Sequence, residues 1–496
     1  MTSEESPYTV IDGEYTTAVV FISEENLEDS AREQIQEMVN HPAFRNQVRV
    51  MPDAHYGAGC VIGFTMPLTN RVSPNVVGVD EGCGLHSFKL ADVPFDITDE
   101  SDLLEIDELV RDAVPMAYNT HSGGVYHVGE KFPWDEFAEK WGVFAENHLD
   151  SEIPLGKYHP DEFDPDVEFY KDLCAKVGYN INDGINSVGT LGKGNHFIEF
   201  SISESDGSLW CTIHSGSRGL GATITEYHQE RAEKLRKSDT IREFLNTEIP
   251  EDYHQYIKFD MDTVSDEDLL DWLQGGMGES FVDYDLLEDT YGGTDEASRI
   301  SEIGNKLKEA LTVLDESEGD ELAYLEGSEA VEYYVDLAFG QTYASENRKT
   351  MAKLIADVLD AQIVDEIEAV HNYIDYEDGI IRKGATPANE GQRAVIPMNM
   401  AEGVLVVEGK GNPDWNYSVC HGAGRTMSRN QARDELSKEA LQEWMADVVS
   451  TELPIEESPD AYKETALIER SITPSVEIVD KLKPILNLKA PETSYY

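Results

Sequence analysis

The sequence predicts an α+β fold, in which strands and helices are mixed along the chain. Short apolar runs separated by glycines favour strands, and segments with apolar residues three or four positions apart favour helices. The two kinds do not alternate regularly, which argues against a repeated βα pattern. With 496 residues, 40% of them hydrophobic, the chain is long enough to bury a large core.

The strands and helices can be placed approximately from these patterns. We expect a strand at 17–23, an amphipathic helix at 29–40, and buried strands with tight turns within 50–90. Residues 195–213 predict two strands, NHFIEFSI and SLWCTIH, joined by the turn ESDGS. Long helices are expected at 224–245 and 345–370, the second ending at His371-Asn372, and a third helix at 429–449.

Residues 246–325 differ from their surroundings because they are polar, acidic and rich in glycine. We interpret them as a surface-exposed helical insertion. The residues suited to chemistry lie on both sides of this segment, so residues 1–496 are predicted to form a single catalytic domain with the insertion inside it. A short C-terminal tail, APETSYY, occupies 490–496.

The charge of the chain is strongly acidic, with 98 acidic and 38 basic residues and a formal net charge of -60. Because the acid is spread over the whole chain, we expect a halophilic protein whose self-repulsion is screened by salt. Such a charge repels nucleic acid at long range. The window 371–433 is an exception, since it holds seven basic and seven acidic residues and would tolerate a polyanion.

Nothing in the sequence predicts a membrane or an oxidising compartment. The N-terminal MTSEESPYTV has no basic or apolar signal region, and no apolar stretch approaches the ~20 residues of a membrane span. The five cysteines are sparse and odd in number, which disfavours a disulfide scaffold. We therefore expect a cytoplasmic protein.

Histidine, cysteine and aspartate recur beside glycine-rich turns. A single histidine of this kind is more often a structural or surface residue than a ligand, but here four of them repeat the association. Asp80 and Cys83 lie three positions apart in a glycine-flanked turn, where both side chains can reach one ion. The segments are MPDAHYGAG (51–59), GVDEGCG (78–84), GKGNHFIE (192–199), HSGSRGLG (214–221), HN (371–372) and CHGAGR (420–425).

A thiolate, several imidazoles and one carboxylate suit a transition metal such as Zn, Mn, Fe or Co. These donors exceed what one tetrahedral ion needs, and a thiolate bridging two ions would use them all. The alternative is a single structural zinc, which usually pairs its ligands more closely in sequence.

The glycine-rich segments also favour phosphate, because backbone N–H groups in such turns form anion cradles. GKGN occurs at 192–195 and again at 409–412. The HGAGR segment combines a nucleophilic histidine, small residues and an arginine that can bind phosphate. Each glycine taken singly can equally be a simple turn.

Taken together, the segments MPDAHYGAG, GVDEGCG, LGKGNHFIE, HSGSRGLG, HNYI, RKGAT and HGAGRTMSR resemble the RtcB family of RNA ligases, from about residue 17 to Lys489. ASENR (344–348) and DAYKETALIERS (460–471) resemble its connecting segments. The resemblance implies an RtcB-like fold, with mixed β-sheets and helices packed around a central di-metal cleft.

The resemblance also implies two Mn²⁺ ions and GTP as cofactors. Asp80, Cys83 and His196 would bind one ion, and Cys83, His214 and His371 the other. His421 would be the catalytic nucleophile that carries GMP. The nucleotide would be lined by Asn195, His196, Phe197, Ile198, Glu199, His371, Asn372, Pro397, Met398, Asn399, Met400, His421, Gly422, Ala423, Gly424 and Lys489.

The implied reaction joins RNA 3′-phosphate or 2′,3′-cyclic phosphate ends to 5′-hydroxyl ends, as in tRNA splicing or RNA repair. The implied partners are RNA, such as tRNA halves, and an archease-type activator protein. Five basic residues are candidates for RNA phosphate contacts, although surface salt bridges to the abundant acids are an equal alternative. They are Arg218, Arg382, Lys383, Arg425 and Arg429.

Three departures from the family pattern affect the neighbourhood of these residues. A P-G-S-M-G-type loop usually precedes the nucleophile, whereas this chain has PMNMAEG at 397–403. Glu81 replaces an apolar residue, and seven residues follow Lys489 where family chains usually end. These departures affect the side-chain contacts of the loop and the position of the lysine, while the candidate metal ligands and His421 match the family pattern.

Two other functions are compatible with the same residues. One is a metal-dependent phosphodiesterase or another nucleotidyl transferase, which would not form a guanylylated histidine. The other is a non-catalytic protein that binds RNA ends, which would bind metal and GTP without joining RNA.

Overall fold

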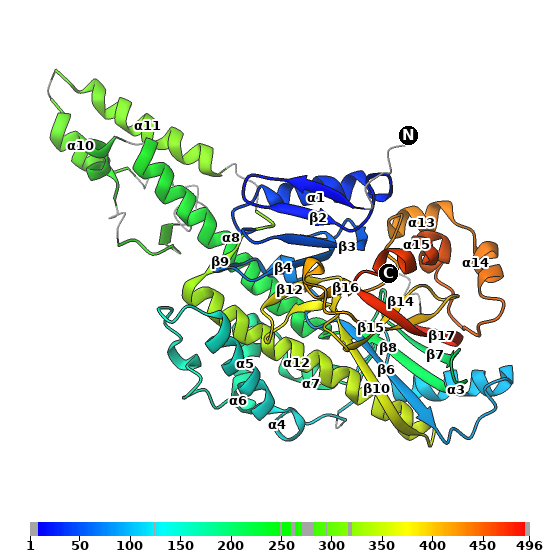
Figure 1. Cartoon of the computed structure of the whole chain (residues 1–496). Helices are drawn as coiled ribbons and strands as arrows, with labels where there is room; N and C mark the ends of the chain where they lie inside the picture. The colour runs from blue at the N-terminus through cyan, green and yellow to red at the C-terminus, as the bar shows by residue number, and fades with distance from the viewer. Residues whose placement is uncertain are drawn as a thin grey trace, which may run out of the picture. The chain divides into compact units, whose positions relative to one another are not determined.

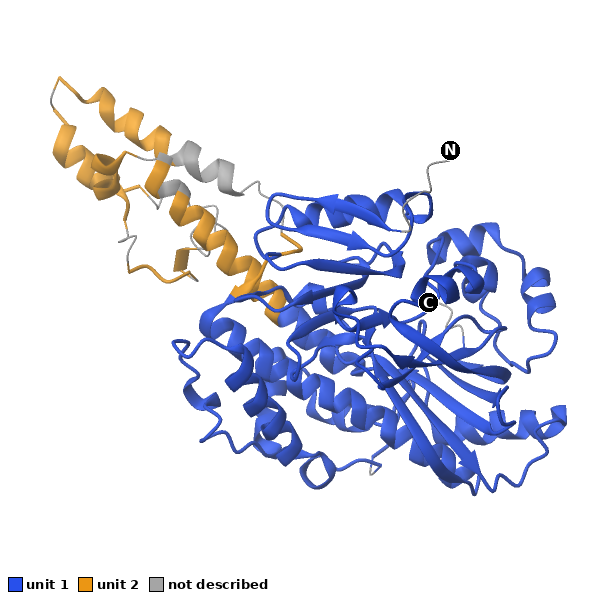
Figure 2. Ribbon diagram, in the orientation of Figure 1, with its two compact units in different colours: residues 1–227, 326–496 blue, residues 228–325 orange. Residues whose placement is uncertain are grey.

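The computed structural model describes residues 8–491, except residues 124, 249, 259–262, 267, 270–281, 294 and 316–319. The predicted C-terminal tail therefore lies largely outside the described residues. The chain forms two compact units, Met1–Tyr227 with Glu326–Tyr496, and His228–Leu325 (Figure 2). The elements are mixed as the sequence predicted, and the α+β class is confirmed (Figure 1).

The first unit contains a seven-stranded antiparallel sheet that carries most of the candidate site. Its two end strands also lie side by side, because Arg393 on one forms an ion pair with Asp365 on the other at 2.7 Å. In spatial order the strands are β10 (Gln362–Val370), β6 (Gly84–Ala91), β8 (Leu209–Ser215), β7 (Phe197–Ser203), β17 (Val476–Lys489), β15 (Val404–Gly409) and β14 (Arg393–Pro397).

A six-stranded sheet lies beside it, with β2 and β3 parallel and the other pairs antiparallel. Its strands are β1 (Thr9–Asp12), β2 (Thr17–Val20), β3 (Val48–His55), β4 (Ile62–Pro67), β12 (Ile380–Lys383) and β11 (Asn372–Ile374). The shorter strands are β13 (Ala385–Pro387), which pairs with β16 (Ser418–Cys420), β5 (Arg71–Val72) and β9 (Leu325–Glu326).

The helices of the first unit pack against its sheets or against the long helix at Gly327–Val358. They are α1 (Asp29–Val39), α2 (Pro74–Val77), α3 (Glu100–Ala113), α4 (Val128–Lys131), α5 (Trp134–His148), α6 (Val167–Val177), α7 (Ile181–Ser187), α12 (Gly327–Val358), α13 (Arg429–Glu435), α14 (Lys438–Trp444) and α15 (Thr465–Ile472). Short 3-10 helices are η1 (Glu24–Asn26), η2 (Gly156–Tyr158), η4 (Pro413–Trp415), η5 (Ile455–Glu457) and η6 (Pro459–Ala461).

Alternate residues of the seven-stranded sheet enter two different cores. Ile198 and Ile213 pack with Ile106 of α3 and Met351 of α12 on one face. Phe197, one residue along, packs on the other face in a core that includes β14, β15 and α15. Because side chains alternate along a strand, β7 presents its odd-numbered residues Phe197 and Glu199 to the face opposite α12.

The second unit has a hydrophobic core of its own, which includes Ile241, Tyr256, Leu287 and Ile303. It contains most of α8 (Arg218–Glu248), together with η3 (Glu251–Tyr256), α10 (Tyr284–Tyr291) and α11 (Ser298–Asp315). The predicted insertion at 246–325 falls inside this unit, which begins earlier, at His228. Within the part of the chain that is described, no helix is long and apolar enough to cross a membrane.

Two helix predictions were wrong. The predicted helix 345–370 ends at Val358, Asp360 takes a left-handed φ of 49°, and residues 362–370 form β10. Ile367 and Ala369 are buried while Glu366 and Glu368 face outward, a period of two that favours a strand. The predicted helix 429–449 is two helices, because Ser437 begins α14 by capping the backbone N–H of Ala440.

Candidate metal centre and nucleotide site

Five of the predicted side chains converge at the edge of the seven-stranded sheet. Asp80 and Cys83 lie in the turn before β6, His196 directly precedes β7, His214 lies near the end of β8, and His371 directly follows β10. The donor atoms form two sets, within each of which all atoms lie within 4.8 Å of one another. The sets are Asp80 with Cys83 and His196, and Cys83 with His214 and His371.

Cys83 belongs to both sets. Its Sγ lies 3.3 Å from Nε2 of His214 and 3.7 Å from Nε2 of His196. The Nε2 atoms of His214 and His371 are 3.2 Å apart. The sulfur of Cys83 is therefore within reach of two candidate cation positions, each completed by a different pair of side chains.

Backbone carbonyls determine which nitrogen of two rings carries the proton. Nδ1 of His196 donates to the carbonyl of Leu191 at 2.8 Å, and Nδ1 of His214 donates to that of Asn195 at 3.2 Å. Since a carbonyl oxygen only accepts, the neutral form of each ring carries its lone pair on Nε2. Nε2 of His196 faces Oδ2 of Asp80 at 2.9 Å. Burial lowers the pKa of His214 and of His371, which keeps these rings neutral.

Nε2 of His214 faces both the sulfur of Cys83 and Nε2 of His371, so a cation between these atoms would be bound by all three. The same backbone-to-ring hydrogen bonds orient imidazoles in metalloproteins. The donor set of one sulfur, three imidazole nitrogens and a carboxylate therefore fits transition-metal ions.

The backbone of the HSGS segment (214–217) lies close against the side chain of Asp80. Ser217 donates its backbone N–H to Oδ1 of Asp80 at 3.1 Å. A Cβ atom on the neighbouring Gly216 would lie 2.2 Å from that same oxygen, so only glycine fits there. The HSGS segment thus holds the carboxylate through its backbone.

Two side chains of α12 support the metal-ligand loops, and sequence analysis had assigned them no role. The fully buried Arg348 donates to the carbonyls of Gly82, at 2.6 Å, and Ser215, at 2.9 Å. Asn347 accepts the N–H of Gly189 at 2.8 Å and donates to the carbonyl of Gly216 at 3.0 Å. Only the resemblance of ASENR to a connecting segment had drawn attention to this stretch.

His421 follows β16 and lies against the metal-ligand cluster, with its ring centroid 4.7 Å from that of His371. Its Nδ1 donates to Oδ2 of Asp53 at 2.8 Å, and the Asp53 side chain is fully buried. A Cβ atom on Gly424, which has a φ of 73°, would lie 2.4 Å from the Asp53 carbonyl oxygen, so the HGAG turn needs glycine there. Asp53 belongs to the MPDAHYGAG segment but had been given no function.

A cavity beside His421 is lined by most of the residues predicted to contact a nucleotide. They are Asn195, Phe197, Glu199, Pro397, Met398, Asn399, Met400, His421, Gly422, Ala423, Gly424 and Lys489. His214 lines it as well. Four other predicted residues do not line the cavity, namely His196, His371, Ile198 and Asn372. His196 and His371 belong to the two donor sets, and Ile198 packs in the core beneath α12. Asn372 accepts the Gly384 N–H at 3.0 Å.

The far end of this cavity contains a charge cluster around Glu457, which sequence analysis missed. Its carboxylate forms ion pairs with Lys489 at 3.0 Å, Arg429 at 2.6 Å and Arg425 at 3.5 Å. Burial alone would raise the pKa of Glu457, but these cations lower it to about 2. Nearby, burial raises the pKa of Glu199 to about 7.

The altered 397–403 loop is ordered by its own side chains. Oδ1 of Asn399 accepts the backbone N–H groups of Ala401 and Glu402, each at 3.0 Å, and the side chains of Met398 and Met400 are buried. Glu81 is also fully buried, and Thr225 donates to its Oε1 at 2.9 Å. Burial raises the pKa of Glu81, which favours the neutral, protonated form of this carboxyl group.

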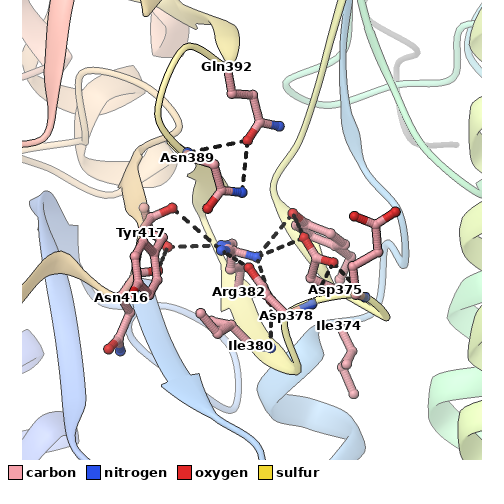
Figure 3. Close-up of polar contacts among 12 residues, drawn as sticks. Ile374, Asp375, Asp378, Ile380, Arg382, Asn389, Gln392, Asn416 and Tyr417 are labelled. Carbon is pink, nitrogen blue, oxygen red and sulfur yellow. Dashed lines mark hydrogen bonds and ion pairs between the residues drawn. The ribbon is translucent and has the colours of Figure 1, made fainter. Parts of the chain in front are cut away.

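Two of the five predicted RNA-contacting cations are buried structural residues. The Arg382 side chain is fully buried and forms ion pairs with Asp378 at 2.7 Å and Asp375 at 3.2 Å (Figure 3). Lys383 is 5% exposed and donates to backbone carbonyls of Ala58 and Asn75. The prediction of RNA contacts is wrong for these two, because their charge is used inside the protein.

The other three cations lie nearer the surface. Arg218, half-buried, donates to the Thr190 hydroxyl at 3.1 Å and the Ala117 carbonyl at 3.2 Å. Arg425 and Arg429 line the cavity beside His421.

The fold and this arrangement define a protein with two adjoining sets of side chains that could hold metal ions, beside a histidine and a cavity lined by Arg425, Arg429 and Lys489. The chain belongs to the tRNA-splicing ligase RtcB family, whose model matches residues 34–264 and 298–490. It is 26% identical over 487 residues to the RNA-splicing ligase RtcB of Escherichia coli (strain K12), covering 93% of this chain and 95% of that protein.

Archaeal relatives match over a similar span. The chain is 25% identical over 504 residues to the tRNA-splicing ligase RtcB of Methanococcus maripaludis, covering 89% of this chain and 87% of the relative. It is 24% identical over 466 residues to the tRNA-splicing ligase RtcB of Aeropyrum pernix, covering 84% and 82%.

Proposed function

We propose that this protein is a GTP- and manganese-dependent RNA ligase. It joins RNA ends that carry a 3′-phosphate or a 2′,3′-cyclic phosphate to ends that carry a 5′-hydroxyl. The names of its relatives support RNA ligation. The observation that carries the proposal is the sulfur of Cys83, which is shared by two donor sets and lies beside a histidine, His421, whose Nδ1 is held by Asp53.

In this proposal Asp80, Cys83 and His196 hold one manganese ion, and Cys83, His214 and His371 hold the second. When bound, the ions neutralise the triphosphate and align it for in-line displacement. The buried loops keep the donors in place through Arg348 and Asn347.

His421 acts as the nucleophile. Its Nδ1–H is held by Asp53, so Nε2 carries the lone pair that attacks the α-phosphorus of GTP. The N–P bond forms as the bond to pyrophosphate breaks, and the buried carboxylate of Asp53 stabilises the positive charge that develops on the ring. The guanylyl group then passes to the RNA 3′-phosphate, and a 5′-hydroxyl displaces GMP. A cyclic phosphate is first opened by water.

The test is the joining of a 3′-phosphate RNA to a 5′-hydroxyl RNA with Mn²⁺ and GTP at molar salt, with and without an archease-type activator. The proposal predicts a joined strand whose formation requires GTP and is lost in His421→Ala. Hydrolysis of the RNA or of GTP without joining would favour the phosphodiesterase alternative. Binding of metal and GTP with no product would favour a protein that only binds RNA ends.

A further inference from the structure

His55 belongs to the same motif as Asp53, and the reaction described above gives it no task. Its Nδ1 donates to the backbone carbonyl of Asp53 at 2.7 Å, while the side chain of Asp53 accepts from Nδ1 of His421 at 2.8 Å. One residue therefore fixes both imidazoles in the same tautomer. Since a carbonyl oxygen only accepts, Nε2 of His55 carries a lone pair.

His55 also lies where two cavities meet. It lines the cavity beside His421, and it lines a second cavity of about 530 Å³. Arg425 and Arg429 are shared by the two cavities in the same way. The second cavity adds Ser30, Tyr56 and Ser428, and Glu28 is the one acidic residue in its lining. The lining therefore combines two cations with hydroxyl-bearing residues, which bind sugar and phosphate oxygens.

The geometry of the joining reaction limits the direction from which the acceptor RNA can approach the phosphorus. The attacking and leaving oxygens of a phosphoryl transfer lie roughly in line, on opposite sides of the phosphorus. In the final step the leaving group is GMP, which occupies the cavity beside His421. The attacking 5′-oxygen must therefore approach from another side, and the second cavity adjoins the first at His55, Arg425 and Arg429.

We propose that the second cavity binds the 5′-hydroxyl end of the acceptor RNA, and that His55 is the base that takes the proton of that hydroxyl. This inference rests on the proposed ligase function. As the O5′–P bond forms, the P–O bond to GMP breaks, GMP leaves with the electron pair, and the hydroxyl proton passes to Nε2 of His55. Burial lowers the pKa of the free ring to about 4, which keeps Nε2 unprotonated before this step.

The test isolates the last step by supplying a donor RNA whose 3′-phosphate already carries GMP. Removing a positioned base reduces such a step by about 10²-fold or more, so His55→Ala and His55→Gln should join this donor to a 5′-hydroxyl acceptor that much more slowly. In reactions started with GTP, the activated donor strand should accumulate. The control is His159→Ala, an exposed histidine that lines neither cavity.

An acceptor RNA with a 5′-thiol in place of the 5′-hydroxyl tests whether His55 acts as a base or only supports the structure. A thiol ionises at pH ~8.5 and therefore does not need a base. His55→Ala should join this acceptor within about threefold of the wild-type rate, well inside the loss expected for a missing base. Wild-type joining of the hydroxyl acceptor by His55→Ala would overturn the inference, as would equal losses for both acceptors. Failure of the wild-type protein to join any activated donor would instead overturn the ligase function itself.

Discussion

Nδ1 of His421 donates to Oδ2 of Asp53 across 2.8 Å, joining residues 368 positions apart in the chain. The carboxylate selects the tautomer of the ring and turns its Nε2 lone pair outward. Asp53→Asn should therefore reduce guanylylation by about 10²-fold or more, because an amide can also present its N–H₂ group and favour the wrong tautomer.

The measurement is the rate of covalent labelling by GTP, with bound metal quantified in the same samples. Metal content should stay at the wild-type level, since Asp53 belongs to neither donor set. Asp164→Asn, at an exposed position, is the matched control. Unchanged labelling in Asp53→Asn would show that the contact does not position the nucleophile.

Cys83→Ala should remove both metal ions and every step of the reaction, because its Sγ is common to the two donor sets. Metal content by atomic emission and labelling by GTP measure the effect. Cys174→Ala is the control, since this cysteine is also buried but lies on α6, outside both sets. Retention of one full equivalent of metal, or normal guanylylation, would refute the bridging role.

The charge cluster around Glu457 predicts a pH dependence of stability. Its pKa falls from 4.5 to about 2 in the folded protein, so its stabilising contribution is complete above pH 4.5 and is lost as the pH falls toward 2. For this buried group the shift corresponds to about 3 kcal/mol.

Urea unfolding of wild type and Glu457→Gln at fixed molar salt measures this contribution. The difference in unfolding free energy should be large at pH 6 and should shrink steadily below pH 4.5. The exposed Glu439→Gln should show no such difference. A difference that is constant with pH would contradict the role given to the ion pairs.

Substitutions of Arg382 and Arg429 should have different effects, the first mainly on stability and the second mainly on RNA joining. Arg382→Ala leaves Asp375 and Asp378 without their buried partner and should destabilise the protein by about 3–5 kcal/mol. Arg429→Ala, at a partly exposed position beside the cavity, should slow RNA joining with a much smaller loss of stability. Urea unfolding and joining rates measured on both variants test this, and the reverse pattern would show that the two residues had been assigned wrongly.

The net charge of -60 predicts that stability and activity increase with salt. Unfolding temperature and joining rate should both rise between about 0.1 M and molar KCl, as the Debye length shortens from about 10 Å to 3 Å. An optimum of both quantities at low ionic strength would contradict a halophilic protein.

The convergence of the five candidate metal ligands was predictable because each lies in or beside a short glycine-rich motif, and these motifs adjoin strand ends at a common sheet edge. The strand β10 was missed because its buried residues Ile367 and Ala369 are few, and the preceding helical pattern extended naturally into it. Its position matters, because β10 leads directly to His371.

Partners distant in sequence were harder to predict. The contact of Asp53 with His421 depends on tertiary packing, and so does the burial of Arg348 beneath the metal-ligand loops. For Arg382 the sequence suggested a role that the structure does not support. This cation lies in a neutral window and was predicted to contact RNA, but it forms buried ion pairs with Asp375 and Asp378. Charge type can be read from a sequence, whereas the partner that neutralises it depends on the fold.

The most direct test of the account is to find where a guanylyl group attaches. The protein is incubated with Mn²⁺ and GTP labelled at the α-phosphate, and the modified peptide is identified by mass spectrometry. The account predicts one acid-labile GMP on His421 of the wild-type protein and none in His421→Ala, which retains its metal. Labelling that persists in His421→Ala, or a guanylyl group on another residue, would contradict it.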